Sequence, residues 1–253
     1  AFLAVTAVLL YALFVKSKSS RQISRLMYTD DLTGIWNLSK FRIEAEAKIK
    51  NAKSGSYVLL YADIKQFKMI NDTFGFNEGD ELLCLYAEAV KEVTESGECY
   101  ARVSADQFVL LLKYKDWDQV LERTAAIEAR LNGLVKSRNK KYFLVLCFGA
   151  YIITEPDKNI SWMLDQANYA RRSIKTEHKS KTVLYDENMR RQELLQKELS
   201  DQMDRAVREH EFVCYFQPKV NMATREIIGS EALVRWNHPE KGLMLPGAFV
   251  PYF

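Results

Sequence analysis

The chain has 253 residues, 48% of them hydrophobic, and its 36 basic and 33 acidic residues leave a formal net charge of +3. This composition is enough to bury at least one sizeable core and excludes a disordered chain. The near balance of charge gives no support to a nucleic-acid-binding surface, so no nucleic-acid partner is expected. Four widely spaced cysteines without a CxxC pair are expected to stay reduced.

The first fifteen residues, AFLAVTAVLLYALFV, carry no charge and are followed by the basic stretch KSKSSR. A helix that crosses a bilayer needs about twenty apolar residues, so we interpret residues 1–15 as the C-terminal part of a transmembrane helix. A signal peptide fits less well because its basic residues should precede the apolar run, and a buried core helix is the remaining alternative. The basic residues predict a location at the inner (cytoplasmic) membrane, with the globular part in the cytoplasm.

The middle of the chain alternates between helical and strand patterns, which predicts an α+β fold. The apolar run YVLLYADI predicts a buried strand that ends near Asp63, and ECYARVSADQFVLLLKY predicts a β-hairpin that turns at SAD. Between them, apolar residues at helical spacing predict two helical pieces, broken by Gly75 and Gly79. The remaining expected elements are a linker helix at 16–28, an amphipathic helix at 41–53, helices at 117–135 and 160–174, and strands within 142–153 and at 182–185.

A highly charged stretch from Glu187 to Arg208 favours a helix with a loose apolar stripe, and we place the domain boundary there. The predicted organisation is a first domain at 29–186, a connector helix at 187–210 and a strand-rich segment at 211–253. The last segment is too short to make a stable independent domain.

Asp63 follows one apolar strand, and Asp106 precedes another. If these strands are neighbours, both acids lie at one edge of a sheet. Two carboxylates there would suit Mg²⁺, which prefers a few oxygen ligands together with substrate phosphates. The alternative is two solvated acids at strand ends. The spacing of the residues alone does not decide between these readings.

Three motifs in this region resemble the GGDEF family of diguanylate cyclases over roughly Tyr28 to Asp186. They are DDLTGIWN (30–37), DIKQFKMINDTFGFNEGD (63–80) and ARVSADQFVLL (101–111), in the order and register of the family. The resemblance implies a ferredoxin-like nucleotidyl-cyclase fold with helices around a mainly antiparallel sheet. It also implies a reaction in which two GTP molecules, one on each subunit of a homodimer, condense into cyclic di-GMP.

The signature itself departs from the pattern GG[D/E]EF, because the corresponding residues are Ser104, Ala105, Asp106, Gln107 and Phe108. In the family the two glycines let the backbone approach the nucleotide, and the fourth residue is a carboxylate that assists activation of the attacking hydroxyl. Side chains at Ser104 and Ala105 would crowd a turn that needs a positive φ. Gln107 is a neutral amide that cannot accept a proton, so the catalytic position is expected to be non-functional and cyclase activity close to absent.

Nucleotide binding is expected to survive where turnover does not. The resemblance assigns a Mg (or Mn) ion to Asp63, the backbone carbonyl of Ile64 and Asp106, and the guanine edge to Asn71 and Asp80. It further assigns GTP contacts to the turn at Ser104 and Ala105 and to the basic residues Arg171 and Lys175, whose alternative reading is an ordinary solvated helix face. The RxxD product-inhibition site of the family corresponds here to Glu95 and Glu98, and two acids there are expected to repel cyclic di-GMP.

The last segment, YFQPKVNMATREIIGSEALVRWNHPEKGLMLPGAFVPYF, resembles the beginning of an EAL phosphodiesterase domain, a TIM-like barrel that hydrolyses cyclic di-GMP with two metal ions. The resemblance makes Glu231 a metal ligand and makes Arg235 and Gln217 substrate contacts. The family's other ligands and its general base would lie beyond Phe253, so the chain as given is not expected to form a hydrolytic site.

These inferences predict a membrane-anchored bacterial cyclic di-GMP signalling protein. In the first hypothesis, a degenerate GGDEF domain binds GTP and Mg²⁺ and regulates an attached EAL phosphodiesterase. The alternatives are a weakly active cyclase, or a catalytically silent scaffold that dimerises or docks a partner.

Overall fold

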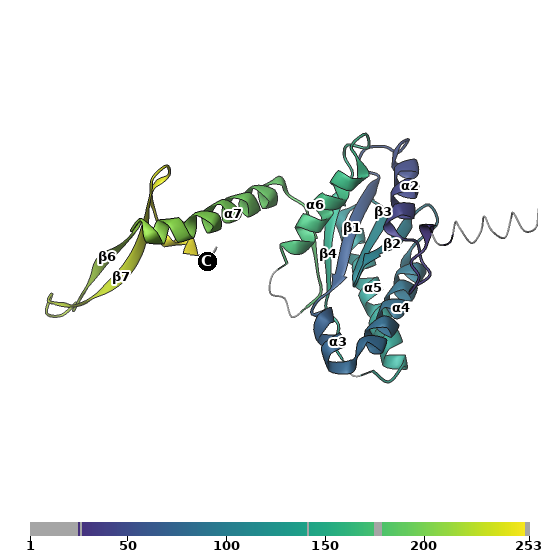
Figure 1. Cartoon of the computed structure of the whole chain (residues 1–253), viewed down its shortest axis with the longest axis horizontal. Helices are drawn as coiled ribbons and strands as arrows, with labels where there is room; N and C mark the ends of the chain where they lie inside the picture. The colour runs from purple at the N-terminus through teal and green to yellow at the C-terminus, as the bar shows by residue number, and fades with distance from the viewer. Residues whose placement is uncertain (1–24, 26, 141, 175–178, 251–253) are drawn as a thin grey trace, which may run out of the picture. The chain divides into compact units, whose positions relative to one another are not determined.

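The computed structural model describes residues 25, 27–140, 142–174 and 179–250. The chain divides into two compact units, one that ends at Asp186 and one that begins at Glu187. The division coincides with the expected start of the connector helix. Figure 1 shows the elements of each unit.

A five-stranded sheet in the order β2-β3-β1-β4-β5 forms the centre of the first unit. The central strand β1 (Tyr57–Ile64) pairs antiparallel with β3 (Gln107–Lys113) and with β4 (Leu146–Ile152). Strand β2 (Cys99–Ser104) pairs antiparallel with β3, and β5 (Lys181–Leu184) pairs parallel with β4. The prediction of an α+β fold with a mainly antiparallel sheet is confirmed.

Helices cover both faces of this sheet because β1 and β3 carry apolar residues on both sides. Helices α2 (Leu38–Ile49) and α6 (Ile160–Arg172) pack on the face that contains Leu59 and Tyr61. Helices α4 (Phe76–Val93) and α5 (Trp117–Ser137) pack on the face that contains Leu60 and Ala62. The alternation along β1 follows from the two-residue period of a strand, and Figure 1 shows the sheet between the two pairs of helices.

The helical stretch after β1 consists of α3 (Phe67–Phe74) and α4, with Gly75 between them at φ +89°. The expected break is therefore found at Gly75, where a positive φ ends α3. Gly79 does not break the helix, which corrects that part of the prediction. It lies inside α4 because its missing side chain leaves room for Asn71 of α3.

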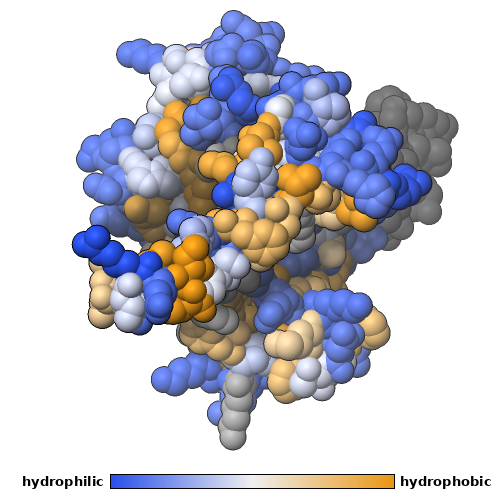
Figure 2. Space-filling view, turned by 90° about the vertical axis from the view of Figure 1, so that its left-hand side faces the viewer, coloured by the Kyte–Doolittle hydropathy of each residue, from blue (hydrophilic) through white to orange (hydrophobic). Residues whose placement is uncertain are grey.

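The second unit contains α7 (Glu187–Arg208), an open three-stranded antiparallel sheet and a short 3₁₀ helix (Pro246–Ala248). The strands are β6 (Phe212–Val220), β7 (Ile227–His238) and β8 (Gly242–Met244). Leu199 and Ala206 of α7 bury Trp236 and Phe249 in a small core. Most residues of β6 and β7 are exposed. Figure 2 shows apolar residues, in orange, at the surface turned toward the viewer.

The expected membrane localisation is corrected by the structure. No helix within the described ranges is long and apolar enough to cross a membrane. The predicted membrane segment at 1–15 lies outside the described residues, as does most of the linker predicted at 16–28.

Candidate functional site

The two acids singled out from the sequence lie together at the C-terminal end of β1. The backbone N–H of Ile64 donates to Oδ2 of Asp106 over 3.1 Å, because antiparallel pairing of β1 and β3 places Ala62 opposite Phe108. Burial raises the pKa of Asp63, and burial together with the negative charge of Asp63 raises the pKa of Asp106. The pair is thus a partly desolvated cluster of negative charge.

Arg171 of α6 contacts Asp63 directly, through Nη1 and Oδ2. Its Nε and Nη2 groups donate to Oδ1 of Asn168, over 2.9 and 2.7 Å, and its guanidinium lies 5.5 Å from the ring centre of Tyr61. The other carboxylate oxygen of Asp63, Oδ1, is buried and has no hydrogen-bond partner among the described residues. The structure therefore places Arg171 against Asp63, a predicted metal ligand.

Gly149 on β4 explains why helix α6 lies so close to the sheet. A Cβ atom at this position would lie 1.9 Å from the carbonyl oxygen of Ala167 and 2.2 Å from the backbone nitrogen of Arg171. Only glycine permits this approach of helix and strand. The backbone of α6 at Arg171 is thus held against the sheet beside Asp63.

The hairpin turn in the signature motif has a backbone conformation typical of glycine, although the turn contains no glycine. Ala105 has φ +44°, in the left-handed region that favours glycine. Arg102 steadies the turn by donating from Nε to the carbonyl of Ala105 over 2.9 Å and from Nη1 to Asp30 over 2.9 Å. The turn therefore has a positive φ at one of the two positions where a side chain was expected to crowd it.

Gln107, at the position of the missing carboxylate, takes part in a local hydrogen bond. The hydroxyl of Tyr61 donates to its Oε1 over 2.8 Å. Tyr61 lies two residues before Asp63 on the same strand, so the two side chains share a face. That alternation is the signal in the sequence by which Tyr61 could have been found.

Asn71 and Asp80 are the residues predicted to bind the guanine edge, and Gly79 lies beside Asn71. Oδ1 of Asn71 is buried and has no partner in the part of the chain that the structure describes, and a Cβ on Gly79 would lie 1.8 Å from it. Asp80, one residue further along α4, is exposed. Lys175, the other predicted phosphate contact, lies outside the described residues.

The donor set fits one divalent cation. Asp63 offers a buried oxygen to which no described residue bonds, and Asp106 offers a carboxylate beside it. The neutral Gln107 and the guanidinium of Arg171 are less suited to a second cation. Within the described ranges there is no group of three or more acidic, histidine or cysteine side chains that could hold a metal.

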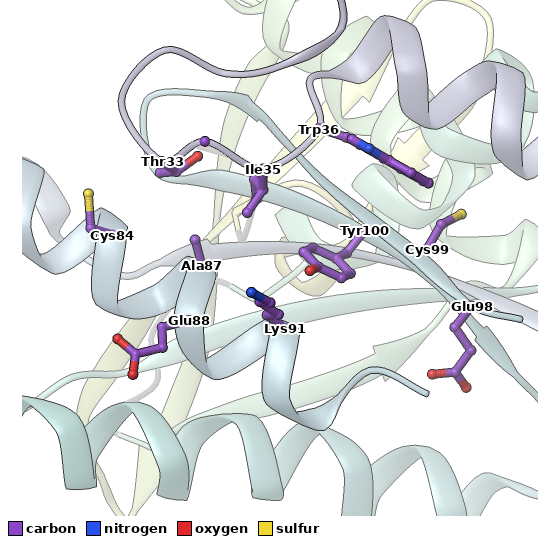
Figure 3. A pocket seen from close by; sticks show the side chains of 11 residues that line it. Thr33, Ile35, Trp36, Cys84, Ala87, Glu88, Lys91, Glu98, Cys99 and Tyr100 are labelled. Atoms are coloured by element: carbon purple, nitrogen blue, oxygen red, sulfur yellow. The ribbon is translucent and has the colours of Figure 1, made fainter. Parts of the chain in front are cut away.

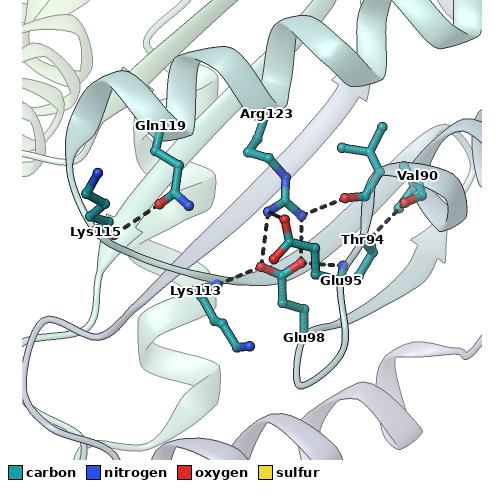
Figure 4. A network of polar contacts seen from close by, with 9 residues as sticks. Val90, Thr94, Glu95, Glu98, Lys113, Lys115, Gln119 and Arg123 are labelled. Atoms are coloured by element: carbon teal, nitrogen blue, oxygen red, sulfur yellow. Dashed lines mark hydrogen bonds and ion pairs between the residues drawn. The ribbon is translucent and has the colours of Figure 1, made fainter.

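The two acids at the expected inhibition site, Glu95 and Glu98, both form ion pairs with Arg123. The side chain of Glu98 is fully buried and accepts from Nη2 of Arg123 over 2.7 Å, from the backbone N–H of Glu95 over 2.7 Å and from that of Lys113 over 2.9 Å. Arg123 also donates to Glu95 and to the carbonyl of Val93 (Figure 4). Arg123 pairs with both acids and compensates one of their two negative charges, so the weak binding of cyclic di-GMP expected here stays a prediction.

A cavity of about 480 Å³ lies elsewhere, between residues 33–36, helix α4 and the start of β2. Trp36, Lys91 and Tyr100 are among its lining residues, and Figure 3 shows the carboxylate of Glu98 directed away from them. None of the predicted GTP-binding residues lines this cavity.

The EAL-like residues lie on the β6–β7 hairpin. Gln217 and Glu231 are directly opposite each other, and Glu231 lies 3.5 Å from Nζ of Lys219. The guanidinium of Arg235 lies 5.6 Å from the ring centre of Tyr215. A single acidic side chain at this place does not complete a metal site.

Comparison with known families identifies both parts of the chain. The family model described as "Diguanylate cyclase, GGDEF domain" matches residues 27–181, and the model described as "EAL domain" matches residues 200–253. The bifunctional diguanylate cyclase/cyclic di-GMP phosphodiesterase MucR of Pseudomonas aeruginosa is 25% identical over 237 residues, which cover 93% of this chain and 35% of that protein. The cyclic di-GMP phosphodiesterase NbdA of the same organism is 22% identical and is covered over 30% of its length. The chain therefore spans about a third of the length of these relatives.

Solved structures show the same fold. The coiled-coil and GGDEF domain of DgcB from Caulobacter crescentus, in complex with c-di-GMP, has a TM-score of 0.60 and 19% identity, and covers 72% of this chain and 97% of its own. The S helix-GGDEF-EAL structure of LapD from Vibrio cholerae, bound to c-di-GMP, has a TM-score of 0.56 and 12% identity, and covers 95% of this chain and 56% of its own.

Proposed function

The chain belongs to the GGDEF family and continues into part of an EAL domain, and from this premise we propose that its GGDEF domain binds GTP without converting it efficiently into cyclic di-GMP. Bound GTP would then regulate an EAL phosphodiesterase in a protein that carries a complete EAL domain. The single observation that carries the proposal is the buried Oδ1 of Asn71, which has no hydrogen-bond partner among the described residues.

A buried acceptor without a donor costs free energy unless a ligand satisfies it. The Watson–Crick edge of guanine presents N–H donors, which suit an amide oxygen. Gly79 leaves room for the side chain of Asn71, because any larger residue at position 79 would displace the amide. This pairing of an orphaned acceptor and a glycine favours guanine over bases that present only acceptors at the same position.

Turnover is disfavoured by the signature residues. Gln107 has no proton-accepting carboxylate, and its Oε1 already accepts from Tyr61. Phosphoryl transfer depends on positioning and charge stabilisation, so losing this group removes part of the catalytic arrangement. A divalent cation, held by Asp63 and Asp106 when bound, would supply charge neutralisation for the phosphates.

The regulatory step requires that GTP bind with different affinity in two states of the protein. We assign the communication between domains to α7, the helix that joins the GGDEF fold to the EAL strands.

The proposal is tested by calorimetric titration of the whole chain with GTP, with ATP as the comparison nucleotide. GTP is expected to bind, ATP to bind much more weakly, and Asn71→Ala to lose the preference for GTP. Asn132→Ala on α5 is the matched control and is expected to bind like the parent. Absence of GTP binding, or equal binding of both nucleotides, would contradict the proposal.

A further inference from the structure

The Asp63 carboxylate already faces positive charge from the protein. Arg171 contacts its Oδ2, and the two side chains are only 12% and 19% exposed. Lys65 acts in the same direction, since its charge lowers the pKa of Asp63 against the larger effect of burial. An ion pair this poorly exposed is screened much less than a surface pair.

Arg171 is also held firmly in place. Two of its N–H groups bond to Oδ1 of Asn168, its guanidinium lies over the ring of Tyr61, and the close approach at Gly149 fixes its backbone. A guanidinium carries five N–H groups, and these contacts with Asn168 and Asp63 use three of them. Among the described residues, these contacts leave two N–H groups for a phosphate oxygen, in the planar geometry that suits phosphate recognition.

A divalent cation has to compete with this arrangement. Magnesium demands several oxygen ligands in near-octahedral geometry. Asp63 retains one oxygen without a partner in the described part of the chain, and one oxygen of Asp106 accepts from the backbone N–H of Ile64. To use both oxygens of Asp63, the cation must displace a guanidinium that is anchored at three points.

We infer that Arg171 supplies on Asp63 the positive charge that a divalent cation would otherwise supply, so that the domain binds GTP with little dependence on metal. The inference rests on the proposed function, since it specifies how the same site receives the triphosphate. Arg171 bridges the carboxylate and the phosphates as a built-in cation.

The test is a GTP titration of the whole chain in excess Mg²⁺ and in excess EDTA. The two dissociation constants are expected to differ by less than about tenfold, which corresponds to ~1.4 kcal/mol. Binding with Mg²⁺ and none with EDTA would overturn the inference while the proposed function stands. If GTP binds in neither buffer, both this inference and the proposed function are contradicted. The comparison uses the unaltered protein, so it does not depend on the folding of a variant.

A substitution series identifies the residue responsible. Arg171→Gln is expected to weaken GTP binding in EDTA by about tenfold or more and to recover most of it in Mg²⁺. Arg172→Gln, on the same helix with its guanidinium 4.8 Å from the Tyr169 ring centre, is the control and is expected to keep the parent's behaviour. Unchanged binding by Arg171→Gln in EDTA would contradict the assignment to Arg171.

A second readout needs no nucleotide. Mn²⁺ binding followed by electron paramagnetic resonance is expected to be weak in the parent and stronger in Arg171→Gln, because the variant frees Asp63. Equal Mn²⁺ affinity in the two proteins would contradict competition between the guanidinium and the cation.

Discussion

Nη2 of Arg123 donates to Oε2 of Glu98 over 2.7 Å, and this bond ties helix α5 to the loop before β2. The Glu98 side chain is fully buried, so its removal leaves the guanidinium of Arg123 without its main partner. Glu98→Ala is expected to lower the free energy of unfolding by ~3 kcal/mol. Urea unfolding measures the change.

The control for this prediction is Glu95→Ala, since Glu95 also bonds to Arg123 but its side chain is 60% exposed. Its expected cost is under ~1 kcal/mol. Equal losses in the two variants would contradict the structural role of Glu98.

The turn at Ala105 offers a stabilising substitution. Ala105 has φ +44°, a conformation that costs an ordinary residue about 1 kcal/mol relative to glycine. Ala105→Gly is therefore expected to raise the free energy of unfolding by ~1 kcal/mol. The same change at the exposed helical residue Ala125 should act in the opposite direction, by ~1 kcal/mol. A loss of stability in Ala105→Gly would show that the turn is not strained.

Two helical glycines give a matched pair for the guanine site. Gly79→Ala places a Cβ 1.8 Å from Oδ1 of Asn71, whereas Gly133→Ala meets nothing within 4 Å. Gly79→Ala is expected to displace the amide and weaken GTP binding by tenfold or more, corresponding to ~1.4 kcal/mol. Gly133→Ala is expected to leave binding unchanged and to stabilise the fold by ~1 kcal/mol. Tight GTP binding by Gly79→Ala would remove Asn71 from the site.

The raised pKa of Asp106 is expected to make the stability of the fold depend on pH. Burial raises its pKa above the usual 3.8, so the folded state holds this proton more tightly than the unfolded state. Stability contributed by the protonated group is present below pH 3.8 and is lost as pH rises through the raised pKa. Asp106→Asn keeps an acceptor for the Ile64 N–H but removes the charge, so it should be more stable than the parent at neutral pH.

The advantage of Asp106→Asn should shrink as the pH falls toward 3.8, where Asp106 itself becomes neutral. Urea unfolding of both proteins from about pH 4 to about pH 7 measures the difference. An advantage that grows toward low pH would give the opposite sign and contradict the assignment.

Local sequence patterns predicted most of the first unit. The apolar run before Asp63 predicts a strand covered on both faces, and the polar turn before Phe108 predicts a hairpin, so Asp63 and Asp106 were expected to meet. Helix positions followed from apolar spacing. The exception, Gly79, lies inside a helix because its role is close packing and not termination.

Contacts between residues far apart in the chain could not be predicted from the sequence. The approach of Arg171 to Asp63 joins residues 108 positions apart and depends on the missing side chain of Gly149. The compensation of Glu98 by Arg123 likewise depends on how α5 packs beside α4. A charge pattern along the chain gives the sign of each side chain but not its partner, which is why the sequence predicts two acids here but not their pairing with Arg123.

We propose that the domain holds GTP but lacks a carboxylate needed to join two GTP molecules. One measurement tests it most directly: the whole chain is incubated with GTP and Mg²⁺, bound nucleotide is quantified after rapid separation, and the nucleotides are then identified by chromatography. The account predicts bound GTP and no cyclic or linear dinucleotide. Accumulation of cyclic di-GMP, or the absence of bound GTP, would contradict it.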